Sequence, residues 1–186
     1  GESITLSWVV TGDPGTYQYW ETSPSNVAAR GLYGAFIILG ENEDDLGQPI
    51  VLSDFFRSSM GNLLSRSHGR LSAPATSSPL NHRVGIFPLD ALLVNGLLSG
   101  AILQRTRLRL VNTAAVFAFK VSLEQHAFDV VASDGSPVVP FRCISVIIAP
   151  GERFDVDVVD PLDGQYEFLV ETLEVAPRRA TAKWQV

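Results

Sequence analysis

The chain has 186 residues and a formal net charge of −6, with 14 lysines and arginines against 20 aspartates and glutamates. An acidic chain without a run of basic residues is a poor partner for nucleic acid or an anionic membrane, so we expect neither. The single cysteine, Cys143, excludes an intrachain disulfide and a cysteine-rich metal site. No stretch approaches the roughly 20 apolar residues of a membrane span, and the first residues lack the basic and apolar regions of a signal peptide.

Alternation of apolar and polar side chains with a period of two recurs along the chain and predicts half-buried strands. The alternating runs cover residues 4–10, 105–110, 117–124, 154–159 and 166–171. Clusters of glycine, proline, aspartate and serine follow these runs, for example at 12–15 and 133–136, and favour turns. Many short strands with regular turns predict an all-β fold of the antiparallel sandwich class.

One segment departs from this alternation. Asp54 offers a helix N-cap, and Phe56 and Met60 follow it at helical spacing. We therefore predict one short helix over residues 54–67. The stretch 71–80 has no periodicity and few large apolar side chains, so we expect it to be a surface loop.

The chain divides at an acidic segment with glycine at its borders. Residues 1–40 hold about three predicted strands, too few to close a sandwich, whereas residues 48–186 exceed the roughly 100 residues that a sandwich needs. We therefore expect the C-terminal part of a first domain in 1–40, an acidic linker in 41–47 and a complete second domain in 48–186. The rest of the first sandwich would come from another chain or from segments outside this one.

Two groups of side chains are candidates for contact with another protein. Only 18% of the residues are charged, against about 25% in an average domain, which favours protein contacts. The three arginines of residues 105–109 share one face of a predicted strand. This face is either solvated or a docking stripe for an acidic strand of a partner. The aromatic group is either ordinary core or an interface. The predicted interface residues are Trp8, Tyr17, Tyr19, Trp20, Arg105, Arg107 and Arg109.

No catalytic or metal-binding residue is predicted from local motifs. His68, His82 and His126 are too far apart in sequence for a local metal motif, so we expect His126 to be structural, with a metal role as the alternative, and the other two to be solvated. Cys143 is expected to be a small structural thiol. The sequence contains neither a Gly-x-Ser-x-Gly elbow nor a phosphate-binding glycine loop.

A series of short motifs runs along the chain at residues 15–20, 31–38, 49–56, 92–96, 107–112, 134–135 and 149–153. Their order and spacing resemble those of the multicopper oxidase family, the laccase-like cupredoxins. The resemblance implies cupredoxin-type Greek-key sandwiches and enzymes that take electrons from a substrate at one copper and reduce dioxygen at a copper cluster. In this family the middle domain usually binds no copper and acts as a spacer and as a wall of the substrate site. An extracytoplasmic, lumenal or secreted location is implied by the resemblance alone.

The chain departs from the family where copper ligands are expected. The family pattern Thr-Tyr-Trp-Tyr-His-x-His corresponds to residues 16–22, which read Thr-Tyr-Gln-Tyr-Trp-Glu-Thr. Side chains two positions apart on a strand share a face, which lets a His-x-His pair converge on metal. Trp20 and Thr22 stand at those two positions, and an indole N–H has no lone pair to give, while a neutral hydroxyl is a poor copper ligand. The sequence therefore predicts a degenerate copper site.

Three functions remain open from the sequence. The first is a catalytically inactive structural or interaction subunit with no cofactor of its own, whose first sandwich another chain completes by strand addition. The alternative is a fragment of a larger copper-dependent oxidoreductase whose metal sites lie outside this chain. A third is a small-molecule binding module that uses the cleft between the two sandwiches.

Overall fold

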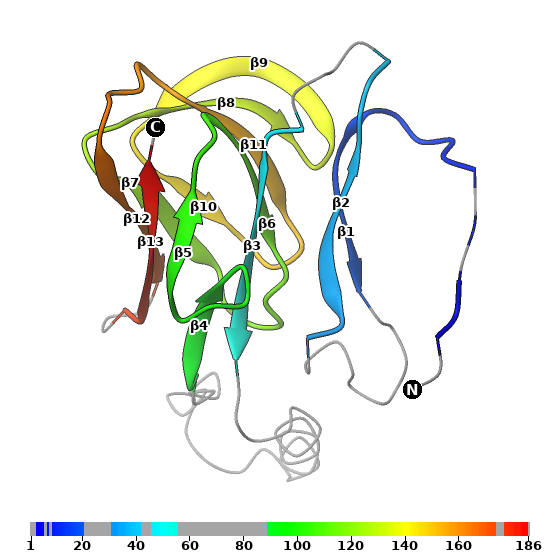
Figure 1. Ribbon diagram of the computed structural model, residues 1–186, viewed down its shortest axis with the longest axis horizontal. Coiled ribbons are helices and arrows are strands. Elements are labelled where there is room, and N and C mark those ends of the chain that lie inside the picture. Colours follow the sequence, from blue (N-terminus) through cyan, green and yellow to red (C-terminus); the bar gives the residue numbers. More distant parts are fainter. Residues whose placement is uncertain are drawn as a thin grey trace, which may run out of the picture.

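The structure, a computed structural model, describes residues 3–5, 7, 9–20, 31–41, 46–55, 89–173 and 177–185. Within these ranges the chain forms thirteen strands, shown in Figure 1. The first three are β1 (Gly15–Trp20), β2 (Tyr33–Ile38) and β3 (Gln48–Phe55). The others are β4 (Ala91–Val94), β5 (Ser99–Leu103), β6 (Arg107–Asn112), β7 (Phe119–Leu123), β8 (Phe128–Ser133), β9 (Ser136–Cys143), β10 (Val146–Ile148), β11 (Arg153–Val158), β12 (Gln165–Thr172) and β13 (Arg179–Gln185).

Two large sheets form a sandwich, which confirms the predicted all-β class. One sheet has the order β10-β7-β12-β13-β5 and the other the order β4-β3-β6-β11-β8-β9. Most neighbouring strands are antiparallel, while β3 pairs with β6 and β13 with β5 in parallel. Alternation explains the packing: one face of each strand supplies the core, which includes the fully buried Phe119, Phe128, Phe168 and Trp184.

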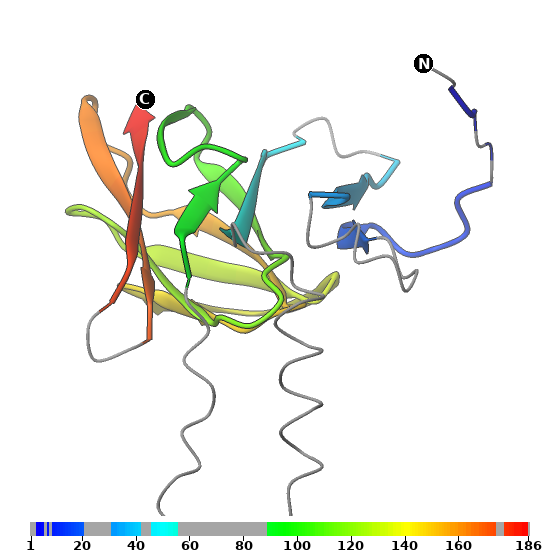
Figure 2. The ribbon, with the colours of Figure 1, turned by 90° about the horizontal axis from the view of Figure 1, so that it is seen from below.

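Strands β1 and β2 form a separate antiparallel sheet that lies beside the sandwich. Figures 1 and 2 show this pair next to the sheet that contains β3 and β6, and β1 contacts both β6 and β11. The pairing runs from Gly15 opposite Ile38 to Trp20 opposite Tyr33. The part of the chain that the structure describes contains no helix long and apolar enough to cross a membrane.

Two of the predicted elements differ from the structure. The helix predicted over 54–67 is wrong at its start, because Asp54 and Phe55 end strand β3. The remainder of that segment and the loop predicted over 71–80 lie outside the described residues. The strand predicted over 4–10 is wrong at its described residues, which form no strand and leave Ile4 and Val9 exposed.

Candidate functional site

The arginines predicted to form a stripe lie next to an acidic strand of the same chain. In the register of β6 and β11, Arg109 stands opposite Asp155 and Arg107 opposite Asp157. The Arg109 Nη1 lies 2.7 Å from Asp155 Oδ2, and the Arg107 Nε lies 2.8 Å from Asp157 Oδ1. Arg109 is only 2% exposed, so the expectation of a solvated basic face is wrong at this residue.

Arg105 has a different environment from the other two arginines. It lies before β6 and is exposed, and its carbonyl oxygen accepts a hydrogen bond of 2.9 Å from Trp184 Nε1. The two arginines within β6 therefore serve contacts inside the fold, and a contact of Arg105 with another protein stays a prediction.

The predicted aromatic group is partly exposed along β1. Tyr19 and Trp20 are 53% and 54% exposed, whereas Tyr17 is half-buried and its hydroxyl donates to the Asp13 carbonyl at 2.9 Å. Tyr17, Tyr19 and Trp20 line a shallow pocket of about 370 Å³ together with Gln18 and Arg153. Trp8, the fourth member of the group, lies outside the described residues.

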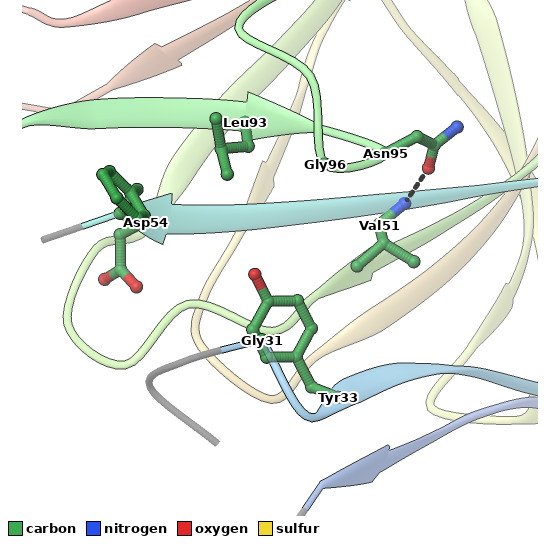
Figure 3. A pocket seen from close by; sticks show the side chains of 8 residues that line it. Gly31, Tyr33, Val51, Asp54, Leu93, Asn95 and Gly96 are labelled. Carbon is green, nitrogen blue, oxygen red and sulfur yellow. Dashed lines mark hydrogen bonds between the residues drawn. The ribbon is translucent and has the colours of Figure 1, made fainter. Parts of the chain in front are cut away.

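A larger pocket of about 530 Å³ lies where β2, β3 and β4 meet, within the volume range of small-molecule sites. Figure 3 shows the ring of Tyr33 pointing from β2 toward β3, with Leu93 on the far side of β3. The amide of Asn95, at the end of this pocket, is already used: its Oδ1 accepts from the Val51 N–H at 2.8 Å, and its Nδ2 donates to the Pro49 carbonyl. Its walls come from β2 of the predicted first domain and from β3 and β4 of the predicted second domain, so it lies in the cleft that the sequence left open as a binding site, although none of its lining residues was predicted as a site.

Asp54 lines the same pocket, and its carboxylate is hydrogen-bonded to the loop after β6. Its carboxylate accepts hydrogen bonds from the backbone N–H groups of Ala115 and Val116, both at 3.0 Å. Burial raises the pKa of this carboxyl, and the backbone hydrogen bonds partly offset the rise. Asp54 therefore holds a loop in place, which is the structural use of the residue that the sequence suggested as a helix cap.

His126 is buried with both ring nitrogens occupied. Its Nδ1 lies 2.7 Å from the Glu124 carbonyl oxygen, and the Leu162 N–H donates to its Nε2 at 3.3 Å. A ring that carries hydrogen on Nδ1 satisfies both contacts. The ring also packs edge-on against Tyr166 and Trp184, with centroid distances of 4.5 Å and 5.0 Å. This environment matches the structural role expected for His126.

The described residues do not fit a bound copper ion. Copper favours histidine and cysteine ligands that converge, and the nitrogens of His126 are used inside the fold. Cys143 is half-buried, and burial raises the pKa of its thiol, which disfavours the thiolate that binds metal. In the described ranges no three histidine, cysteine or acidic side chains form a group that could hold a metal ion. His68, His82 and Thr22 lie outside those ranges.

The chain is similar in sequence to known proteins. The family model described as multicopper oxidase matches residues 47–182. Laccase-3 of Botryotinia fuckeliana is 29% identical over 187 residues, which cover 90% of this chain and 40% of that protein. Multicopper oxidase MmcO of Mycobacterium tuberculosis is 28% identical over 176 residues, which cover 78% of this chain and 34% of MmcO.

Solved structures show the same fold. The laccase from Botrytis aclada has a TM-score of 0.67 at 23% identity, covering 91% of this chain and 35% of that one. Fet3p, a multicopper oxidase that functions in iron import, has a TM-score of 0.69 at 21% identity, covering 92% and 34%. The chain thus spans well under half the length of these proteins, and its sandwich is of the cupredoxin type. The chain belongs to the multicopper oxidase family.

Proposed function

We propose that this chain is a copper-free scaffold unit of a copper-dependent oxidoreductase, whose copper is bound by segments other than the described residues. The observation that carries the proposal is the environment of His126, whose two nitrogens bond Glu124 and Leu162 within the fold. The match to a multicopper oxidase model over 47–182 and the partial span of the relatives support it. In this role the chain holds neighbouring domains in place and takes no part in electron transfer.

The proposed scaffold has two parts. We propose the division inferred from the sequence, with the end of a first domain in 1–40, a linker in 41–47 and a second domain in 48–186. The sheet of β1 and β2 has only one pairing between its strands in the described residues, so each strand has an edge that another segment of the same protein could extend. The exposed Tyr19 and Trp20 would then contact that segment.

A second candidate is a catalytically inactive structural or interaction subunit completed by another chain. One observation favours it: residue 20, where the family pattern has a copper-binding histidine, is a tryptophan whose side chain is half exposed. An indole cannot supply the lone pair that copper needs. An extracytoplasmic or secreted location is proposed for either candidate from the family alone.

Metal analysis of the full-length encoded protein separates the two candidates. The scaffold proposal expects stoichiometric copper with blue absorbance, and light scattering that fits one continuous polypeptide. Full-length protein without copper, in complex with a different chain, would overturn the scaffold proposal and favour the interaction subunit. The same protein should be loaded with copper before measurement, so that loss of metal during purification is not mistaken for the absence of a site.

A further inference from the structure

Two arginines join β1 to the sandwich. Arg153 Nε donates to the Thr16 carbonyl oxygen at 3.5 Å, a backbone contact, whereas the buried Arg109 contacts the Thr16 side chain. The Arg109 Nη1 donates to the Thr16 hydroxyl oxygen at 3.1 Å and to Asp155 Oδ2 at 2.7 Å. The Arg109 Nε donates to the Leu46 carbonyl at 2.7 Å. Thr16 is 1% exposed, so its hydroxyl lies in a site with little water to compete for the hydrogen bond. Arg109 therefore contacts β1, β11 and the segment before β3 at once.

The start of β1 also approaches the turn between β8 and β9 at backbone distance. A Cβ atom placed on Gly15 would lie 2.8 Å from the Cα of Gly135 and still closer to its carbonyl oxygen. Gly135 has a φ of 81°, a left-handed conformation that favours glycine, and a Cβ there would lie 2.8 Å from the Tyr17 ring. This close fit defines where β1 lies but carries no hydrogen-bond specificity.

Thr16 supplies that specificity. Side chains alternate along a strand, so a shift of β1 by one residue would replace the Thr16 hydroxyl at Arg109 by a glycine or a tyrosine ring. A buried guanidinium N–H that loses its acceptor is costly, so the pairing penalises such a shift. The same register decides which way Tyr19 and Trp20 extend from the sheet.

We propose that the face of the six-stranded sheet around Arg109 is a docking surface for the chain's own β1–β2 sheet, and that the Thr16 hydroxyl is the group it selects. Thr16 is thus a positioning residue: it sets the position of β1, and through it the direction of the exposed aromatic side chains. This docking would serve the proposed scaffold role, and only that use of it rests on the proposed function. The docking itself involves contacts within this chain alone.

Hydrogen exchange measured by mass spectrometry on the full-length protein tests the docking, with two matched variants. Thr16→Val keeps the side-chain volume and removes the hydroxyl, so we expect amides of β1 to exchange at least about tenfold faster, equivalent to about 1.4 kcal/mol. Thr16→Ser keeps the hydroxyl and removes the methyl, so we expect exchange within about threefold of wild type. Arg107→Met is the control for losing an arginine ion pair between the same two strands, and should leave β1 exchange unchanged.

Three results would overturn the proposal. The first is an unchanged exchange rate of the β1 amides in Thr16→Val. The second is a larger increase of that rate in Thr16→Ser than in Thr16→Val. The third is an equal increase of the exchange rate in β12 and β13, which would mean that the hydroxyl stabilises the whole sandwich. Copper content of the wild-type protein decides the scaffold proposal separately. A copper-free protein with the expected exchange pattern would therefore reject the scaffold role and keep the docking surface.

Discussion

Replacing His126 by phenylalanine tests whether this residue belongs to the fold or to a metal site. Phenylalanine keeps an aromatic ring against Tyr166 and Trp184, so the edge-on packing can persist. It removes the donor to the Glu124 carbonyl and the acceptor for the Leu162 N–H. Each lost hydrogen bond costs about 0.5–1.5 kcal/mol, so we expect the free energy of unfolding to fall by about 2 kcal/mol. That loss changes the folding equilibrium by about 30-fold.

Urea unfolding gives the unfolding free energy, and metal analysis of the same full-length preparation gives the copper bound per polypeptide. The scaffold role expects His126→Phe to lower the unfolding free energy and to leave the copper bound per polypeptide unchanged at temperatures where the variant is folded. A variant of wild-type stability that has lost copper would refute the reasoning, because it would make His126 a ligand. His126→Gln is the companion variant: its amide carries a donor and an acceptor but no ring, so it loses the edge-on packing that phenylalanine keeps and separates the cost of that packing from the cost of the hydrogen bonds.

The remaining predictions concern packing and protonation. Trp184→Phe removes the indole N–H that donates to a carbonyl and should lower the unfolding free energy in urea by about 1–3 kcal/mol, whereas a loss near zero would contradict the hydrogen bond. Burial raises the pKa of Asp54 above its usual 3.8, so folding takes up a proton there. That stabilisation is complete below pH 3.8 and is lost as the pH rises through the raised pKa, so the unfolding free energy of wild type relative to Asp54→Asn should fall over this window in a pH series of urea titrations. Gly15→Ala should cost about 1–3 kcal/mol because its Cβ meets the backbone of Gly135, whereas Gly12→Ala meets only a side-chain end and should cost less; equal thermal stability of the two variants would refute the close approach.

The sandwich was predictable because burial follows the period of two. Phe119 and Val121 in β7 are fully buried while Lys120 between them is exposed, and Phe168 and Val170 in β12 are fully buried on either side of the half-buried Leu169. Such alternation depends only on which face a residue occupies, and the sequence carries that information directly. The family motifs added the cupredoxin type of the sandwich.

The errors arose where a local signal competed with contacts distant in sequence. Asp54 fits a helix N-cap, yet its carboxylate accepts N–H groups from Ala115 and Val116, about sixty residues away. The alternation at residues 4–10 predicts a strand, but strand formation also needs a partner, and the described residues of this segment pair with none. The end of β3 at Asp54 and the lack of a strand at the described residues of 4–10 both depend on contacts with distant residues. A short window of sequence does not contain those contacts. The lining residues of the larger pocket were not predicted for the same reason, since β2, β3 and β4 form its walls, whereas Tyr17, Tyr19 and Trp20 of the smaller pocket were predicted as interface residues.

The arginines of β6 show a pattern that is visible in the sequence but whose burial the sequence does not predict. Arg107 and Arg109 alternate in β6 as Asp155 and Asp157 do in β11, and an antiparallel register brings each arginine opposite one aspartate. The alternation predicts such a ladder once the two strands are known to be neighbours. It gives no reason for Arg109 to be buried while Arg107 remains about one third exposed, because both arginines have the same kind of partner. Arg109 differs in its further contacts, with Thr16 of β1 and with the Leu46 carbonyl before β3, so the burial of this one arginine marks the surface on which the β1–β2 sheet docks.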